Sequence, residues 1–92
     1  MHLGFEWDEA KAKENLRKHR VRFEDAKTIF NDPMLLTFPD YEHSVEEHRS
    51  ISIGLSIKHA LLLVVHTERR ANVRIISARK ATAKEQRTYE TF

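Results

Sequence analysis

Two apolar stretches separated by a short polar break dominate the second half of the sequence. Leu61–Val65 and Val73–Ile76 are rich in β-branched and large apolar side chains, which suit a half-buried strand. Glu68–Asn72 between them is polar, so the segment predicts a β-hairpin. Four arginines lie in or beside this hairpin: Arg69, Arg70, Arg74 and Arg79. Because the planar guanidinium offers a fork of donors that matches phosphate, the hairpin predicts a phosphate-rich ligand.

Composition limits the class of protein. The 92 residues suffice for one domain, residues 1–92, with a single core. The absence of cysteine excludes disulfides, thiolate metal sites and a cysteine nucleophile. The longest apolar run, Ala60–Val65, is too short to span a membrane, and Met1–Asp8 does not have the features of a signal peptide. We therefore expect a cytoplasmic protein that does not associate with membranes.

Charge is distributed unevenly along the chain. Residues 1–48 hold seven Lys and Arg against eleven Asp and Glu, a balance of −4, whereas residues 49–92 hold nine against three, a balance of +6. Such asymmetry points to a polyanion-binding surface in the basic half. Basic residues on solvated faces are also common, so charge alone leaves nucleic-acid binding as one of two interpretations.

The remaining segments predict helices and strands at regular intervals. Leu3–Trp7 alternates like a short strand, and Asp8 can cap a helix that runs to about His19. A second helix is expected over about Arg22–Phe30, ended by Asn31-Asp32-Pro33. Strands are expected at Met34–Phe38 and Arg49–Leu55, on either side of an acidic loop at Pro39–His48.

A last helix is expected to begin near Thr82 and run to about Glu90. Thr82 and Glu85 form the S/T-x-x-E pattern of a capping box. The whole order predicts an α+β fold with a mainly antiparallel β-sheet, two N-terminal helices, a C-terminal helix, and all helices on one face of the sheet.

Several blocks of sequence carry a resemblance to a known family. They are FEWDEAKAKENLRKH, FEDAKTIFNDP, EHRSISIG, HTERR, RIISARKA and EQRTYE. In this order and spacing they resemble the BrnT family of bacterial toxins, relatives of the RelE-type ribonucleases. The resemblance implies a RelE-like fold and an endoribonuclease toxin that halts translation by cleaving RNA. It also implies a cognate BrnA-like antitoxin with a ribbon-helix-helix DNA-binding module, so that operator DNA is contacted only through the antitoxin.

One position departs from the family pattern. The family usually has Gly after Lys-His, whereas this chain has Lys18-His19-Arg20. Gly would allow the helix to end with positive φ, a conformation that Arg adopts less readily. We therefore expect a local difference in this turn.

The chemistry of RNA cleavage suggests roles for particular residues. Cleavage without metal uses the 2′-hydroxyl of the substrate as nucleophile, so the enzyme needs proton-transfer groups and fixed cations for the charge on phosphorus. We predict that Arg69 and Arg79 converge on one phosphate as catalytic cations, with Arg74 as a third candidate. His19 is the predicted general base, because histidine exchanges a proton near neutral pH. His66 is an alternative base, although a strand histidine is more often a packed residue.

Other residues are predicted to bind the substrate. These are Lys18, Arg49, Arg74, Lys80 and Tyr89, the last by stacking on a base. Each has a simpler interpretation as a solvent-facing charge, a surface ion pair or, for Tyr89, a packing residue beside Phe92. His19 likewise could interact only with the end of its helix.

No cofactor or metal is expected. His43 and His48, with Glu42, Glu46 and Glu47, could hold a divalent ion, but no HExxH or Cys/His signature organises them. Ser77 lies within a predicted strand and has no nucleophile elbow around it.

Two alternatives to an enzyme stay open. The first is a non-catalytic nucleic-acid-binding module, such as a transcriptional corepressor, whose arginines only grip phosphates. The second is a partner-binding scaffold without activity. Turnover of RNA separates the enzyme from the binding module, and salt-sensitive RNA binding separates both from the scaffold.

Overall fold

The central β-hairpin is longer than its two apolar stretches. In the computed structural model, which describes residues 4–43 and 47–92, strand β4 covers Leu61–Arg69 and strand β5 covers Asn72–Lys80. The two strands pair antiparallel from Leu62–Lys80 to Arg69–Asn72, and Arg70 turns the chain with φ 59°. The polar break predicted at Glu68–Asn72 is therefore mostly strand, because cross-strand pairing continues to the turn.

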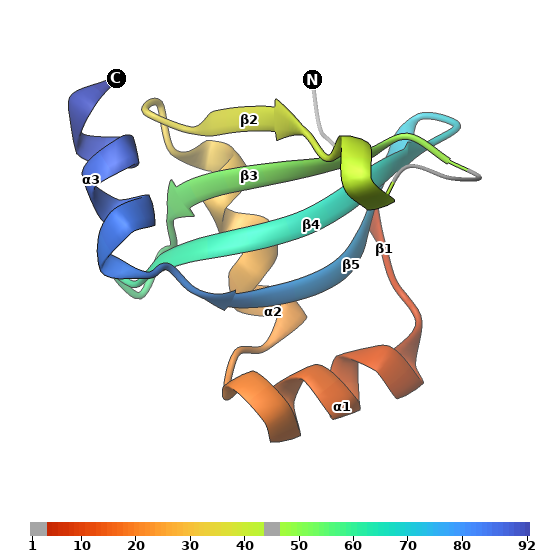
Figure 1. Cartoon of the computed structure of the whole chain (residues 1–92). Helices are drawn as coiled ribbons and strands as arrows, with labels where there is room; N and C mark the ends of the chain where they lie inside the picture. Colours follow the sequence, from red (N-terminus) through yellow and green to blue (C-terminus); the bar gives the residue numbers. More distant parts are fainter. Residues whose placement is uncertain (1–3, 44–46) are drawn as a thin grey trace.

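Three further strands complete a five-stranded sheet of order β1-β5-β4-β3-β2 (Figure 1). Strand β3 covers Arg49–Leu55, as predicted, and β2 covers Leu36–Pro39. Strand β1, Gly4–Glu6, lies beside Asn72–Arg74 of β5 and is the parallel member of a mainly antiparallel sheet. The predicted first residue of this strand, Leu3, lies outside the described residues.

One face of the sheet is covered by a segment that mixes two helix types. Helix α2 spans Phe23–Ala26 and continues as a 3₁₀ helix, η1, over Lys27–Asn31, where a single α-helix was predicted. Such tightening is common where a short helix ends. Phe23 and Ile29 from this segment pack with Val64 and Ile75 of the sheet, and all four are almost completely buried. The second helix was therefore predicted in the right place, although not with the right helix type.

Helix α1, Glu9–His19, lies beside the edge of β5 that β1 leaves unpaired (Figure 1). Its Asp8 cap accepts a hydrogen bond from the N–H of Ala10. The buried Asn15 donates to the carbonyls of Ala78 (2.8 Å) and Val21 (3.0 Å) and accepts from the N–H of Ala78 (3.0 Å). Asn15 therefore satisfies backbone groups that a neighbouring strand would otherwise pair.

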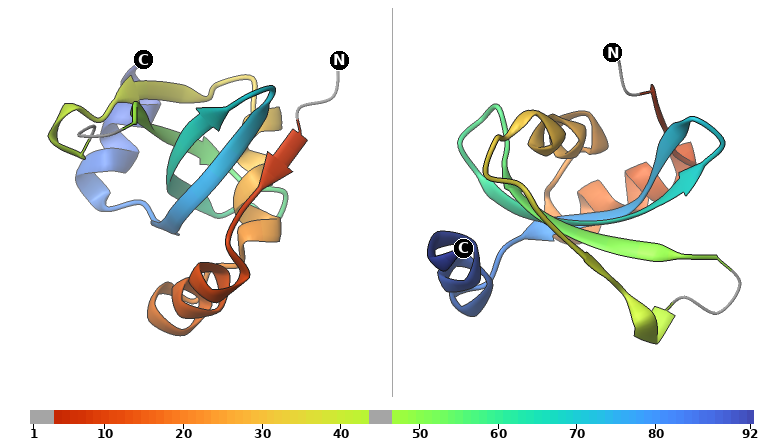
Figure 2. Two further views of the ribbon diagram at one scale, coloured as in Figure 1. Left: turned by 90° about the vertical axis from the view of Figure 1, so that its right-hand side faces the viewer. Right: turned by 90° about the horizontal axis from the view of Figure 1, so that it is seen from above.

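Helix α3, Ala83–Thr91, lies on the other side of the sheet from α2 (Figure 2). The Phe92 ring after it contacts Phe38 of β2, with ring centroids 6.2 Å apart. The Tyr89 hydroxyl donates to Asp32 at 2.6 Å. The prediction that all helices share one face of the sheet is therefore wrong. The sequence of α3 did not indicate its face, because the helix has no fully buried residue. Within residues 4–43 and 47–92, no helix has both the length and the apolar character needed to cross a membrane.

Candidate functional site

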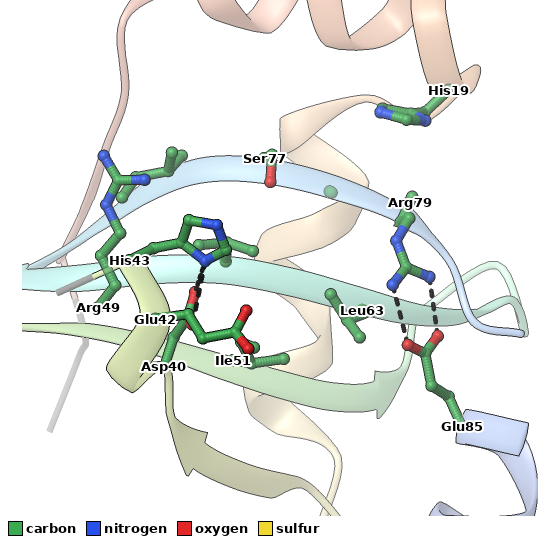
Figure 3. A pocket seen from close by; sticks show the side chains of 13 residues that line it. His19, Asp40, Glu42, His43, Arg49, Ile51, Leu63, Ser77, Arg79 and Glu85 are labelled. Atoms are coloured by element: carbon green, nitrogen blue, oxygen red, sulfur yellow. Dashed lines mark hydrogen bonds and ion pairs between the residues drawn. The ribbon is translucent and has the colours of Figure 1, made fainter.

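The face of the sheet opposite α2 carries a groove of about 450 Å³, a size that suits a small ligand or part of a larger one. Its floor is formed by side chains that alternate with the core residues along the strands, such as Ile51 of β3 and Leu63 and Val65 of β4. Its walls carry ionisable side chains from five helices and strands and from the residue that follows β2 (Figure 3). These are His19, Asp40, Glu42, His43, Arg49, Arg79 and Glu85.

Arg79 lies at one end of the groove and is held by Glu85. The guanidinium donates to both carboxylate oxygens, at 2.8 and 2.9 Å (Figure 3). Glu85 is fixed in turn by the capping box of α3, where it accepts from the N–H of Thr82. The hydrogen bond to Arg79 lowers the pKa of Glu85 to about 2, against the effect of burial, and Glu85 raises the pKa of Arg79. Both groups are therefore charged throughout the physiological range.

Asp40 and His43 form a second polar pair at the groove. His43 Nδ1 lies 3.1 and 3.0 Å from the two carboxylate oxygens of Asp40. The side chain of Asp40 is 9% exposed, whereas that of His43 is 63% exposed. The buried carboxylate therefore orients a ring that faces solvent.

His19 and Arg49 also line the groove. His19 ends α1, beside the Arg79 end, whereas Arg49 begins β3 at the other end (Figure 3). The Nε atom of Arg49 lies 3.6 Å from a carboxylate oxygen of Glu47. Of the predicted site residues, the structure thus gathers His19, Arg49 and Arg79 around one hollow.

Arg69 does not meet Arg79, so the predicted convergence of these two side chains is wrong. Arg69 pairs with Asn72, and Arg79 pairs with Leu63, at opposite ends of the hairpin. Arg79 follows Asn72 by seven steps along β5, which is about 23 Å at the usual rise per residue. The twist of the sheet cannot close that distance.

Arg74 also lies outside the groove lining. It donates to Glu6 at 2.9 Å, and Asn72 donates to the same carboxylate at 3.2 Å. The hydrogen bond from Asn72, followed by that from Arg74, lowers the pKa of Glu6. Arg74 therefore links β1 to β5.

The other predicted residues lie elsewhere. Lys18 is exposed on α1, and Lys80 lines a separate hollow with Lys58 and Leu62. Tyr89 attaches α3 to Asp32, and this hydrogen bond raises the pKa of Tyr89 to about 12. A role in base stacking stays a prediction for Tyr89, whereas its packing role is visible.

His66, the alternative base, is buried in the core face. Its Nε2 lies 2.7 Å from the Ser52 hydroxyl, and its ring packs edge-on against Phe30 with centroids 5.0 Å apart. Burial lowers the pKa of His66 to about 4, so the ring is neutral at physiological pH. It has no access to the groove on the opposite face.

Sequence analysis missed three residues of the groove. Glu85 was interpreted only as a helix cap, and the acidic loop containing Asp40 and His43 only as a loop or a metal candidate. The Asp-x-x-His spacing in a turn is the signal that could have indicated the pair. The metal hypothesis cannot be followed for Glu46, which lies outside the described residues. Residues 4–43 and 47–92 contain no group of three or more His, Cys, Asp or Glu placed to hold a metal ion.

Comparisons with known proteins agree with this architecture. The family model of the ribonuclease toxin BrnT of type II toxin–antitoxin systems matches residues 7–85. The crystal structure of the Brucella abortus ribonuclease toxin BrnT superposes with a TM-score of 0.69 at 23% identity, covering 88% of this chain and 99% of that chain. A comparison with curated proteins finds no match. Because the family model covers most of the sequence, the chain belongs to the BrnT family of ribonuclease toxins of type II toxin–antitoxin systems.

Proposed function

We propose that residues 1–92 form a single toxin domain that cleaves RNA in the groove on the face of the sheet opposite α2, without a metal ion, and thereby inhibits translation in the cytoplasm. The family supplies the general activity of a ribonuclease toxin. The groove supports this location, because it gathers two arginines and two histidines around one hollow.

The observation that carries the proposal is the way Glu85 holds Arg79. A guanidinium has five N–H groups. The two terminal nitrogens of Arg79 donate to the carboxylate of Glu85, and Nη1 also donates to the carbonyl of Lys80. The Nε edge makes no hydrogen bond to any residue in the described part of the chain. A phosphate can therefore approach a second fork of donors, Nε–H and the remaining Nη2–H, on a guanidinium that is already oriented.

Positioned cations and proton-transfer groups are sufficient for cleavage by the 2′-hydroxyl. A fixed guanidinium stabilises the charge that develops on the phosphoryl oxygens, and this preorganisation is typically the largest catalytic contribution. We assign that role to Arg79, proton transfer to His19 and the binding of a neighbouring phosphate to Arg49, because all three line the groove. The 2′-hydroxyl as nucleophile requires no metal-activated water.

The antitoxin is the second part of the proposal. Type II systems pair the toxin with an antitoxin protein, and we propose a BrnA-like ribbon-helix-helix protein that also makes the contacts to operator DNA. The excess of basic residues in the second half of the chain supports a partner with an acidic surface.

The proposal is tested by incubating the purified protein with labelled RNA in EDTA, alone and in a translating extract. We expect cleavage in at least one of the two settings, with products that end in a 2′,3′-cyclic phosphate or a 3′-phosphate. A copy with 2′-deoxy at the scissile position should stay intact. Cleavage that stops in EDTA, or that also cuts the deoxy copy, would contradict the mechanism. Binding of RNA without cleavage in both settings would favour the non-catalytic binding module.

A further inference from the structure

The groove contains a second histidine whose orientation is fixed by a buried carboxylate. Cleavage through the 2′-hydroxyl involves two proton transfers, one from the nucleophile and one to the leaving 5′-oxygen. His19 can carry out only one of them. We propose that His43, held by Asp40, is the general base that removes the proton of the 2′-hydroxyl, an assignment that rests on the proposed function.

The contact with Asp40 determines which nitrogen of His43 is available. Both carboxylate oxygens of Asp40 lie 3.0–3.1 Å from Nδ1, so Nδ1 carries the hydrogen of the neutral ring and donates it to the carboxylate. The other nitrogen, Nε2, is left with a lone pair, which is what a base requires. A buried carboxylate that orients a histidine in this way also stabilises the imidazolium that forms once the proton is taken.

Burial makes Asp40 a rigid support. Its side chain is 9% exposed, and its backbone N–H donates to the carbonyl of Arg49 at 2.8 Å. Asp40 therefore immediately follows β2, at the point where this strand pairs with the start of β3. A group on such a scaffold holds its partner with little freedom. The exposed ring of His43 is correspondingly accessible to a polymer in the groove.

His19 has no comparable support. It ends α1, and no hydrogen bond of its side chain to another described residue is present. His19 and Arg79 lie toward one end of the groove, whereas His43 lies toward Arg49 (Figure 3). A phosphate bound in the groove between these two ends, beside Arg79, would have a histidine on each side, as an in-line displacement requires.

The reaction then proceeds in balanced steps. Nε2 of His43 takes the proton of the 2′-hydroxyl, and O2′ forms a bond to phosphorus while Arg79 stabilises the negative oxygens. The bond from phosphorus to O5′ breaks, and protonated His19 gives its proton to O5′. The products are a 2′,3′-cyclic phosphate and a 5′-hydroxyl, with the proton now on His43.

The test compares His43→Gln and His19→Gln in single-turnover cleavage of an RNA whose cut site has been mapped, in the setting in which the wild type cuts. A second RNA carries sulfur in place of O5′ at that site, because a thiolate leaves without being protonated. We expect His43→Gln to slow cleavage of both RNAs by about 100-fold or more. His19→Gln should slow only the oxygen substrate. His59→Asn, at an exposed turn histidine outside the groove with φ 63°, is the matched control and should cut both at the wild-type rate.

Asp40→Asn tests the positioning role. We expect slower cleavage with unchanged affinity for the 2′-deoxy RNA, and no further loss when Asp40→Asn is added to His43→Gln, because both changes disable one unit. Circular dichroism verifies that each variant folds. If the wild type cleaves RNA and His43→Gln cleaves it equally fast, His43 is not the general base, but the proposed function stands. The same conclusion follows if the sulfur substrate restores cleavage by His43→Gln. Failure of the wild type to cleave in either setting overturns the proposed function itself.

Discussion

At the scale of single residues, Arg79 shows how an ion pair can prepare a site. An exposed ion pair contributes little to stability, but Glu85 is only 23% exposed and is itself hydrogen-bonded to the start of α3. The pair therefore limits the conformations of the long arginine side chain before any ligand arrives. A catalytic cation that is already oriented does not have to be reorganised in the transition state.

Arg79→Ala should reduce RNA cleavage by about 100-fold or more, because it removes a cation from the reacting phosphate and no core volume. Arg79→Lys should recover only part of the activity, since an ammonium cannot form the bidentate fork. Arg69→Ala is the matched control at the other end of the hairpin, and we expect it to weaken RNA affinity more than the cleavage step. Single-turnover rates and binding to 2′-deoxy RNA measure the two effects separately. Equal losses of the cleavage step in Arg69→Ala and Arg79→Ala would contradict the assignment.

His66 makes folding sensitive to moderate acid. Burial lowers its pKa to about 4, below the value of 6.5 for the unfolded chain. The unfolded state therefore binds the proton first, so this contribution to stability is complete above pH 6.5 and is lost as pH falls toward 4. The loss is at most about 3 kcal/mol by the linkage between pKa and free energy. His66→Leu should flatten the dependence of the unfolding free energy on pH in this window, and His59→Asn should not.

Urea denaturation at pH 7, 5.5 and 4.5 provides the measurement. The test compares how steeply the unfolding free energy changes with pH. Loss of the hydrogen bond between His66 and Ser52 lowers this free energy by a constant amount and does not affect the slope. A wild-type slope that persists in His66→Leu would assign the acid sensitivity to other groups. Glu85 cannot produce it, because its lowered pKa acts in a more acidic window, below about pH 4.5.

At the scale of helices and strands, local signals in the sequence were reliable. Asp8 caps α1, and the capping box of Thr82 and Glu85 begins α3, because each device depends on residues three or fewer positions apart. Strand β3 was predicted with its observed bounds from its alternating pattern. The order of the predicted helices and strands gave the α+β class and the mainly antiparallel sheet.

Features that depend on residues far apart in the chain were not predictable in the same way. The side of the sheet on which α3 lies is set by Glu85 with Arg79 and by Tyr89 with Asp32, and the second contact joins residues 57 positions apart. The separation of Arg69 from Arg79 follows from the length and register of β4 and β5, which the predicted polar break at Glu68–Asn72 did not determine. Asp40 and His43 became visible as a pair only once the turn after β2 brought them together.

Asn15 illustrates an element held by a single side chain. Asn15→Ala removes three hydrogen bonds and leaves the buried N–H and C=O of Ala78 without those partners. We expect a loss of about 2–4 kcal/mol of unfolding free energy, since buried backbone groups are costly to leave unpaired. Asn31→Ala, at an exposed position, is the control and should change stability by less than about 0.5 kcal/mol. Chemical denaturation measures the unfolding free energy of both variants. If Asn15→Ala is as stable as Asn31→Ala, α1 is held by other contacts.

Arg20 tests the departure from the family pattern. It ends α1 with φ 61° and ψ 28°, and its N–H donates to the carbonyl of Leu16, so the helix ends in the left-handed conformation even without glycine. Arg20→Gly should stabilise the protein by about 0.5–1 kcal/mol, because the strain of a side chain at positive φ exceeds the entropy that glycine adds to the unfolded chain. Arg22→Gly, at φ −85°, should destabilise it. Thermal unfolding of both variants shows whether each change raises or lowers the melting temperature. A lower melting temperature for Arg20→Gly would mean that the Arg20 side chain makes a stabilising contact.

At the scale of the whole molecule, the excess of positive charge does not lie in the groove. Its lining includes Arg49 and Arg79, but also Asp40, Glu42 and Glu85. The other basic residues of the second half lie outside its lining, and those of the hairpin tip, Arg69 and Arg70, are exposed. The proposed site of cleavage and most of the positive charge of the second half are thus located in different places. A polyanion or an acidic partner is drawn to the molecule by charges outside the groove, which act at a distance.

A cognate antitoxin should therefore contact both the groove and the basic residues outside it. Association and dissociation rates separate the contribution of the outer charges from that of the groove. We expect the complex to lose RNA binding and cleavage, because a protein laid over β5 covers the groove and the basic residues beside it. Arg69→Glu should slow association with the antitoxin several-fold at low salt and change the dissociation rate little, as expected for a steering charge. Lys13→Glu, on the exposed part of α1, makes the same change in net charge and should have a smaller effect. Surface plasmon resonance at two salt concentrations measures both rates. If the complex cleaves RNA as fast as the free toxin, the antitoxin does not cover this face of the sheet.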